Sequence, residues 1–396
     1  MIVVGSLLFD DEVASDLDRL EAAWQAAETF AFVPRKGPVA PSWIEQALAS
    51  LPGSLQQGHF ALLTSGSTGA PKLVVGARSR AEQLARLLHE VQHSEPVTET
   101  VVLLPLTYCY ALVNQWLWAR LFGRALRMTT GLGDPAAVRR TLDGARDAML
   151  CLVGAQAQLL ARHFGQEAFG GVIRVHFAGG PFPQRELPTI HRMFPRAQVY
   201  NNYGCAEAMP RLALRRAEDG ASPADLGAPL PGIELQCDQT GRLLFRSPFA
   251  AVGFVDEQGF HALPPGALVP TGDLGRPGPA GRWLLDGRDG EVFKRYGEKV
   301  AVSAVVGKVL EHWRGEASYV PTPDALGEPG YVLVLAPVPS EDEARQVLRT
   351  LRAHFPRPHW PLRLEGLPAL PRLDNGKVDR VGLAAIGERS VHWRQR

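Results

Sequence analysis

Thr64-Ser65-Gly66-Ser67-Thr68-Gly69-Ala70-Pro71-Lys72 is the stretch that decides how this chain is understood. It places four hydroxyl side chains, two glycines and a lysine directly after the apolar segment 59–63. Glycines let the backbone approach a ligand closely, N–H groups and hydroxyls donate to phosphate oxygens, and the lysine adds positive charge. A Walker A loop is excluded because no Gly-Lys-Ser/Thr sequence occurs. A flexible Ser/Gly linker has a similar composition, but the apolar run before it and Pro-Lys at its end favour a phosphate-binding loop.

Four further motifs follow in order along the chain. They are Tyr203-Gly204-Cys205-Ala206-Glu207, Thr271-Gly272-Asp273, Gly287-Arg288 running on to Lys294 and Gly297, and Pro371-Arg372-Leu373-Asp374-Asn375-Gly376-Lys377. Together with 64–72 they resemble the motifs of the acyl-adenylate-forming superfamily, which contains acyl-CoA synthetases, adenylation domains of nonribosomal peptide synthetases and luciferases. Each motif alone is a weak signal, whereas all of them in the family's order are a strong one.

The composition narrows the class of protein. Of the 396 residues, 45% are hydrophobic and 21% are charged, as in ordinary globular proteins with room for two domains. Lys+Arg 42 balance Asp+Glu 41, so neither nucleic acid nor an anionic membrane is expected as the main partner. The longest apolar runs, such as 148–153, are too short to span a bilayer. The segment 1–9 lacks a basic region and is expected to be a strand, not a signal peptide. Four cysteines without CxxC spacing predict a cytoplasmic protein without a zinc site.

The pattern of elements predicts an α/β fold. From 58 to about 205, apolar runs of strand length alternate with helical periodicity, which is typical of βαβ units around a parallel sheet. The expected strands are 60–63, 101–104, 149–153, 172–178 and 198–201, and the expected helices are 78–92, 110–122, 134–146 and 184–194.

The remainder of the chain changes character twice. Short strands between 225 and 286, among them 233–237 and 242–245, predict a small β subdomain. Later, helices over 304–313 and 340–354 mix with a strand over 331–335. We therefore predict a large N-terminal domain over 1–287, with parallel-type sheets flanked by helices plus the β subdomain. A small mobile C-terminal α+β domain over 288–396 would act as a lid that carries the catalytic lysine.

The resemblance also bears on the N-terminal part. The superfamily usually has a much longer segment ahead of its phosphate loop than the 63 residues that precede Thr64. The chain is thus similar to a compact member with a shortened N-terminus. Since the missing subdomain normally packs on the sheet, a homodimer is expected to cover that surface.

The resemblance implies a reaction in two half-steps. A carboxylate attacks the α-phosphorus of ATP to give acyl-AMP and pyrophosphate, and a thiol then takes the acyl group. Two anions must approach each other in the first step, so charge neutralisation matters more than acid–base chemistry. The implied cofactors are ATP, Mg²⁺ and coenzyme A, or the phosphopantetheine of a carrier protein.

Each motif has an implied role in binding the nucleotide. Glu207 is the implied magnesium ligand, because Mg²⁺ takes one or two carboxylates beside phosphate oxygens. Tyr203 is expected to stack on adenine, although an ordinary half-buried strand aromatic is the alternative. The β- and γ-phosphates would contact Thr64, Ser65, Gly66, Ser67, Thr68, Gly69 and Lys72, and the Gly179-Gly180 pair would line the base.

The C-terminal motifs imply ribose and catalytic contacts. Asp273 would accept both ribose hydroxyls, though Thr-Gly-Asp alone is more often a turn. Arg288 would reach the ribose or the α-phosphate, and Gly297 belongs to the same nucleotide-binding set. Lys377, at the end of a turn signal, would bridge the substrate carboxylate and the α-phosphate in the transition state.

Three positions depart from the family pattern. Ala206 stands where a threonine usually contacts the α-phosphate. Gly290 occupies the usual hinge position, where glycine keeps the freedom to rotate. Tyr108 replaces a histidine that is common in the acyl-pocket motif. These departures bear on rate and substrate choice more than on the class of reaction.

The acyl pocket is expected among Tyr108, Tyr110, Val113, the pair 179–180 and the segment from Cys205 to Met209. Its apolar and aromatic lining favours an aryl or medium-sized hydrophobic acid over an amino acid. The acceptor stays open between coenzyme A, an acyl carrier protein acting in trans and an amine. A non-catalytic nucleotide-binding relative is the remaining alternative, which the presence of Lys72, Glu207 and Lys377 disfavours.

Overall fold

The computed structural model describes residues 7–37, 39–65, 71–180, 182–220, 222–372 and 378–395. The chain divides into two compact units. The first unit comprises Met1–Thr271 with Pro277–Leu284, and the second comprises Gly272–Arg276 with Leu285–Arg396. The predicted domain boundary after residue 287 stays a prediction.

The N-terminal sheet of the first unit positions the glycine-rich run. Its described strands lie in the order β1 (Leu7–Phe9), β2 (Phe30–Val33), β3 (His59–Ser65), β4 (Pro71–Ala77), β14 (Gly253–Asp256) and β15 (Gly259–Ala262). Strands β3 and β4 pair antiparallel, with Thr64 opposite Lys72. The run that opened the sequence analysis therefore begins in one strand and ends in its neighbour. Helices α1 (Asp10–Ser15), α2 (Asp18–Gln25) and α3 (Pro41–Ala49) accompany these strands.

A larger sheet follows in the order β12 (Glu234–Cys237), β13 (Arg242–Arg246), β16 (Val269–Pro277), β17 (Trp283–Arg288), β11 (Asp225–Pro229), β10 (Ala213–Arg216), β9 (Gln198–Tyr203), β8 (Val172–Ala178), β7 (Ala148–Val153), β5 (Glu99–Val102) and β6 (Ala125–Met128). The neighbours from β6 to β9 run parallel, whereas β10 is antiparallel to β9. Strands β16 and β17 contribute residues to both units. The carboxyl ends of β8 and β9 thus lie at one edge, where ligands bind in open parallel sheets.

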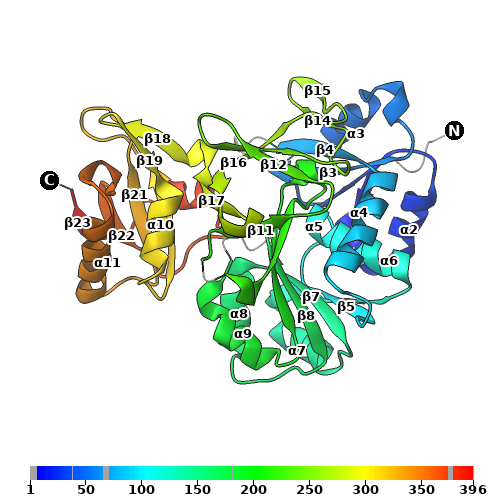
Figure 1. The fold of residues 1–396 in the computed structure, drawn as a ribbon, viewed down its shortest axis with the longest axis horizontal. Coiled ribbons are helices and arrows are strands. Elements are labelled where there is room, and N and C mark those ends of the chain that lie inside the picture. Colours follow the sequence, from blue (N-terminus) through cyan, green and yellow to red (C-terminus); the bar gives the residue numbers. More distant parts are fainter. Residues whose placement is uncertain are drawn as a thin grey trace. The chain divides into compact units, whose positions relative to one another are not determined.

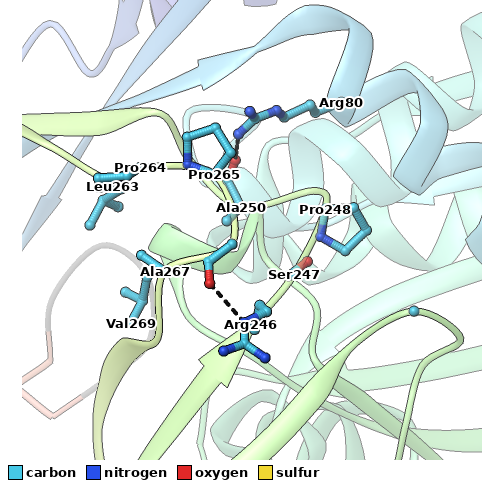
Figure 2. A pocket seen from close by; sticks show the side chains of 12 residues that line it. Arg80, Arg246, Ser247, Pro248, Ala250, Leu263, Pro264, Pro265, Ala267 and Val269 are labelled. Atoms are coloured by element: carbon cyan, nitrogen blue, oxygen red, sulfur yellow. Dashed lines mark hydrogen bonds between the residues drawn. The ribbon is translucent and has the colours of Figure 1, made fainter.

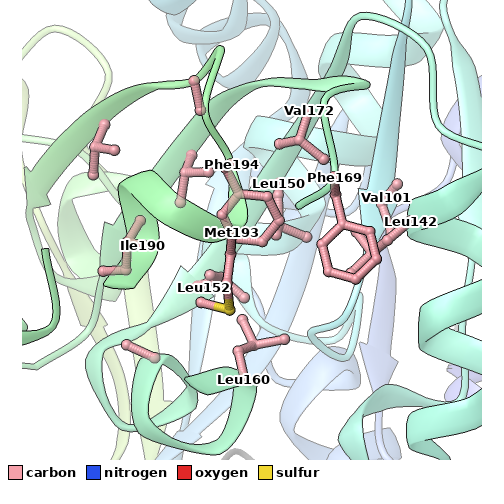
Figure 3. Packing of buried hydrophobic residues seen from close by; sticks show 14 of the residues in the cluster. Val101, Leu142, Leu150, Leu152, Leu160, Phe169, Val172, Ile190, Met193 and Phe194 are labelled. Atoms are coloured by element: carbon pink, nitrogen blue, oxygen red, sulfur yellow. The ribbon is translucent and has the colours of Figure 1, made fainter. Parts of the chain in front are cut away.

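Three helices cover one face of this sheet, namely α7 (Pro135–Asp143), α8 (Gly154–Phe164) and α9 (Leu187–Met193) (Figure 1). On α8 the apolar residues Ala157, Leu160 and Phe164 recur at helical spacing and are buried. They pack with Leu150 of β7 and with Met193 in one core (Figure 3). Each such fully buried large side chain contributes about 1.5–3 kcal/mol, so this core fixes the strand ends.

A second group of helical segments comprises α4 (Arg78–Val91), α5 (Cys109–Ala111), η2 (Leu112–Leu117) and α6 (Trp118–Phe122). The segment η2 is a single π-helical stretch, a feature that is frequent at functional sites. Its Gln115 side chain donates to the Thr100 hydroxyl of β5 at 2.8 Å. The ring of Trp24 contacts both Phe60 of β3 and Trp116 of η2, which ties the N-terminal sheet to these helices.

The second unit has its own sheets and core. The hairpin of β18 (Val292–Arg295) and β19 (Glu298–Ala301) precedes a sheet in the order β20 (Glu316–Pro321), β21 (Tyr331–Ala336), β22 (Arg363–Gly366) and β23 (Ser390–Arg394). Helices α10 (Val302–Leu310) and α11 (Glu341–His354) bury Val305 and Val347 against Leu333. Ser340 and Glu343 form the capping box that begins α11. The short helix α12 (Arg380–Ala385) follows the last motif.

The predicted α/β class is confirmed. The strand expected over 172–178 has these bounds in the structure, and the strand expected over 101–104 ends at Val102. Leu103 and Leu104 are buried in an irregular segment before Pro105. The strands expected between 225 and 286 are present and extend both sheets. The start of the expected N-terminal strand, before Leu7, lies outside the described residues. No helix in the described part of the chain is long and apolar enough to cross a membrane.

Candidate active site

A lysine and a glutamate from different motifs meet in the first unit. Lys72 is the second residue of β4, and Glu207 lies in η5 (Ala206–Ala208), just beyond the end of β9. The Lys72 ammonium donates to the Glu207 carboxylate and forms an ion pair with it. Their side chains are only 20% and 15% exposed. The sequence separately predicted a phosphate-binding cation and a magnesium-binding acid, and the structure places them in contact.

The surroundings of this ion pair fix both partners. The Lys72 ammonium lies 4.9 Å from the centre of the Phe254 ring on β14, which favours a cation. The backbone oxygen of Glu207 accepts a hydrogen bond from the Ala251 amide at 2.8 Å. In the part of the chain that the structure describes, no group of three or more His, Cys, Asp or Glu side chains could hold a metal ion. One carboxylate still fits Mg²⁺, which takes its other ligands from water and phosphate oxygens.

The other residues of the predicted phosphate loop, 64–69, precede Lys72 in the sequence. Thr64 lies opposite Lys72, and its hydroxyl donates to the Lys72 carbonyl at 3.4 Å. Ser65 ends β3. Gly66, Ser67, Thr68 and Gly69 lie outside the described residues, so their predicted phosphate contacts stay predictions.

The predicted adenine contacts lie at the carboxyl ends of neighbouring strands. Gly179 and Gly180 follow β8 directly and are exposed, and Tyr203 is the last residue of β9. Tyr203 is 9% exposed. The next residue, Gly204, has to be a glycine, because a Cβ there would lie 1.8 Å from the Pro210 carbonyl oxygen. The fold thus brings the predicted base-binding residues to one sheet edge.

The second unit holds three further nucleotide-binding candidates, Asp273, Arg288 and Gly297. Arg288 Nε lies 3.2 Å from Asp273 Oδ1, which joins the predicted ribose ligand of β16 to the cation at the end of β17. The Asp273 side chain is 9% exposed, whereas that of Arg288 is 56% exposed. Gly297 lies with Tyr296 at the tip of the β18–β19 hairpin, and both residues have positive φ. That backbone is the type I′ turn that favours glycine.

The predicted catalytic lysine, Lys377, is not among the residues that the structure describes, and neither are the residues 373–376 before it. On either side, Arg372 and Val378 form an antiparallel bridge. The Arg380 guanidinium of α12 contacts the Glu291 carboxylate at 2.5 Å and the Tyr319 hydroxyl at 3.0 Å. These contacts anchor the C-terminal side of the motif.

Close to the residues expected to line the acyl pocket lies a buried charged side chain, Arg211, that the sequence analysis did not predict. Tyr108 and Cys205 are half-buried, and Val113 and Met209 are fully buried. The guanidinium of Arg211, itself only 1% exposed, lies 5.2 Å from the centre of the Tyr110 ring.

Arg211 donates to the side-chain oxygens of Asn202 and Asn114. Sequence reasoning predicted a lining with little charge and missed this arginine. The available signal was its position two residues after Met209 and two residues before β10, next to the predicted pocket segment.

Burial keeps the neighbours of Arg211 neutral. It raises the pKa of the Tyr110 hydroxyl well above its usual value and raises that of the Cys151 thiol to about 12. It also lowers the pKa of His176 well below its usual value, and the nearby Arg211 charge acts in the same direction. The guanidinium is therefore the charged group of this buried cluster.

A cavity of about 440 Å³ opens in the first unit next to the segment that contacts Glu207 (Figure 2). Ala250 lines it, and the following residue, Ala251, donates to Glu207. The Arg80 guanidinium donates to the Ala250 carbonyl at 2.9 Å and Arg246 donates to that of Gly266 at 2.7 Å. Prolines and alanines make up much of the remaining lining, so the cavity presents few groups for chemistry.

The chain is similar to known proteins in sequence and in fold. Residues 12–253 match the family described as AMP-binding enzyme. The chain is 26% identical over 357 residues to an anthranilate–CoA ligase of Pseudomonas aeruginosa, covering 84% of this chain and 68% of the relative. It is 24% identical over 417 residues to a 2-hydroxy-7-methoxy-5-methyl-1-naphthoate–CoA ligase of Streptomyces carzinostaticus, covering 98% and 70%. A crystal structure of the anthranilate CoA ligase AuaEII with anthranoyl-AMP matches with a TM-score of 0.71 and 17% identity, covering 95% of this chain and 77% of that one.

Proposed function

We propose that this chain, which belongs to the family of AMP-binding enzymes, activates an aromatic carboxylic acid with ATP and transfers the acyl group to coenzyme A. The predicted resemblance to the acyl-adenylate-forming superfamily is confirmed. The chain is an enzyme of the acid–thiol ligase type. The identity of the acid, the acceptor and the roles of single residues belong to the proposal.

The main support for this proposal is the ion pair of Lys72 with Glu207. An ammonium group binds phosphate oxygens and a carboxylate binds Mg²⁺. A bound Mg²⁺–nucleotide would therefore replace the Lys72–Glu207 ion pair with two contacts, Lys72 to phosphate and Glu207 to Mg²⁺. The pair lies beside the carboxyl end of β9, at the edge where ligands bind in such sheets.

The proposed mechanism depends on neutralising charge. Lys72 binds the outer phosphates and Glu207 would hold Mg²⁺, which supplies positive charge to the leaving pyrophosphate. Asp273 accepts the ribose hydroxyls, and Arg288 holds that carboxylate in place through its ion pair. Lys377 neutralises the negative charge that builds as the acid oxygen attacks phosphorus. These groups bind and orient the reactants, and no side chain is needed as a base because the carboxylate attacks as the anion.

Two observations favour an aromatic acid. The residues predicted for the pocket include Tyr108 and Tyr110 beside the buried Val113 and Met209, and ring faces pack well on a planar acyl group. The two curated relatives are named for ligation of anthranilate and of a naphthoate. These support an aryl acid over an aliphatic one or an amino acid.

The test is pyrophosphate release by the full chain with ATP, Mg²⁺ and a panel of benzoates, naphthoates, fatty acids and amino acids. We expect release with aryl acids, and an acyl-CoA product when coenzyme A is added. Carrier protein and amines are run in parallel, so that a product with either one instead of coenzyme A replaces the proposed acceptor. A folded protein that binds ATP but releases no pyrophosphate with any acid would overturn the proposal.

A further inference from the structure

Arg211 is a buried cation without a counter-ion. It is 1% exposed, and among the described residues no Asp or Glu forms an ion pair with it. Its two hydrogen-bond acceptors are neutral amides, the Asn202 oxygen and the Asn114 oxygen at 2.7 Å. Its Nε–H is buried and has no acceptor among the residues that the structure describes. An uncompensated buried charge is costly, by several kcal/mol in proteins, so an anion is expected to complete this group.

Arg215, four residues later, shows how the same fold satisfies a buried arginine. It is 3% exposed, and its guanidinium donates to backbone carbonyl oxygens that include those of Asp225, Ala217 and Ser222. Burial lowers the pKa of Arg215, and the Asp225 carboxylate opposes this. Burial also lowers the pKa of Arg211, where the opposing groups are Tyr110 and Cys151, both held neutral. Both arginine side chains are nearly inaccessible to water, but of the two only Arg211 has a guanidinium N–H without an acceptor among the described residues.

The groups around Arg211 are polar and adjoin Tyr110, which is predicted to line the acyl pocket. The Asn202 amide also donates to the Phe177 carbonyl at 3.0 Å and lies 3.5 Å from the Tyr110 hydroxyl. Asn114 comes from the π-helical segment η2 and donates to the Tyr110 carbonyl. On β8, His176 Nε2 is likewise buried without a partner in the described part of the chain. Two nitrogens with unmet hydrogen bonds thus belong to side chains that contact Asn202, which itself lies 3.5 Å from the hydroxyl of Tyr110, a predicted pocket residue.

We propose that Arg211 determines substrate choice by pairing with a second acidic oxygen group on the acyl part, a carboxylate or a phenolate remote from the carboxylate that is activated. This inference rests on the proposed function and narrows its substrate class to aryl acids with two acidic groups. The substrate oxygen accepts from the guanidinium and supplies the missing negative charge. Tyr110 contacts the ring that carries it, and Asn202 and Asn114 hold the guanidinium in position.

The first experiment compares acids on the wild-type enzyme. Pyrophosphate release is measured with benzoate, the three hydroxybenzoates and the three benzenedicarboxylates, and kcat/KM is compared. We expect at least one doubly acidic compound to exceed benzoate by about 100-fold or more, since sites built to pair a polar group strongly reject analogues without it. Equal kcat/KM across the panel would overturn the inference and leave the proposed function standing. Release with none of the acids would instead count against the proposed function.

The second experiment uses Arg211→Met and Arg211→Lys. The ratio of kcat/KM for the preferred acid over benzoate should fall by about 100-fold in Arg211→Met and by less in Arg211→Lys, which keeps the charge. Arg215→Met is the matched control, because it removes an equally buried arginine that has its acceptors. It should lower Tm without changing the ratio. An unchanged ratio in folded Arg211→Met would overturn the inference.

A binding measurement keeps the inference testable if the Arg211 variants fail to fold. Calorimetry with the wild-type chain and each acid, without ATP, should give tighter binding for the doubly acidic compound. Raising NaCl from about 0.05 to 0.5 M should change that preference little, because a buried ion pair is weakly screened. Indistinguishable affinities for benzoate and for all the doubly acidic compounds would contradict it.

Discussion

Lys72 and Glu207 form an ion pair although 135 positions separate them in the chain. The contact exists because β4 and the end of β9 bring two motifs to one place in the first unit. Neither partner is more than 20% exposed, so both groups are held in a defined geometry. This relationship gives the first prediction.

Glu207→Gln keeps the shape of the side chain and removes its charge. We expect kcat/KM for pyrophosphate release to fall by about 10²–10³, the usual cost of one lost electrostatic contact in a transition state. The Mg²⁺ concentration needed for half-maximal rate should rise. Glu257→Gln, at an exposed turn position, is the control and should match the wild type.

Combining this change with Lys72→Met tests whether the two residues act as a unit. Residues in contact show non-additive effects, so the double variant should lose less than the product of the two single losses. Glu207→Gln activity within threefold of wild type at every Mg²⁺ concentration would contradict the assigned role.

Lys377→Ala should separate the two half-reactions. Adenylation measured by pyrophosphate release should fall by about 10²–10³ or more, because the lysine would neutralise charge in that step alone. Thiolysis of preformed acyl-AMP by coenzyme A should stay comparatively intact. Lys308→Ala, at a surface pair with Glu311 on α10, controls for loss of a lysine in the same unit. Equal losses in the two assays would remove Lys377 from the adenylation step.

Asp273→Ala should weaken ATP binding by about 1.5–3 kcal/mol, because two ribose hydroxyls would lose a charged acceptor. Asp286→Ala is a close control. Asp286 pairs with Arg276 at 3.1 Å on the same two strands, but its side chain is 42% exposed. Calorimetric titration with ATP measures both. A change of less than about twofold in the Kd of Asp273→Ala would exclude the ribose contact.

Gly290→Pro tests the predicted hinge. Proline fixes φ near about −65°, so one orientation of the chain would be retained and one half-reaction spared while the other is lost. Gly290→Ala is the control, because a Cβ at this exposed position meets nothing within 4 Å. Adenylation and thiolysis are assayed separately for each variant. Wild-type rates in both assays for Gly290→Pro would show that no rotation at this residue is required.

Much of the fold could be predicted from local sequence. The run 172–178 is rich in apolar and β-branched residues and forms a buried strand with these bounds. The helix expected over 340–354 begins one residue later, at the capping box of Ser340 with Glu343. The helix expected over 110–122 instead contains the π-helical segment 112–117. Periodicity could not separate α from π hydrogen bonding here, because all six residues 112–117 are buried.

The sequence by itself determined the elements, the order of the motifs and the types of residue that could bind a nucleotide, because periodicity and turn chemistry are local properties. Only the tertiary structure decided which of these residues meet. It paired Lys72 with Glu207 and Asp273 with Arg288, and it buried Arg211 among neutral groups. The physical reason is that neighbours from distant strands determine the burial and the charge compensation of a side chain. The sequence alone does not show whether water, a carboxylate or a substrate pairs with a given arginine.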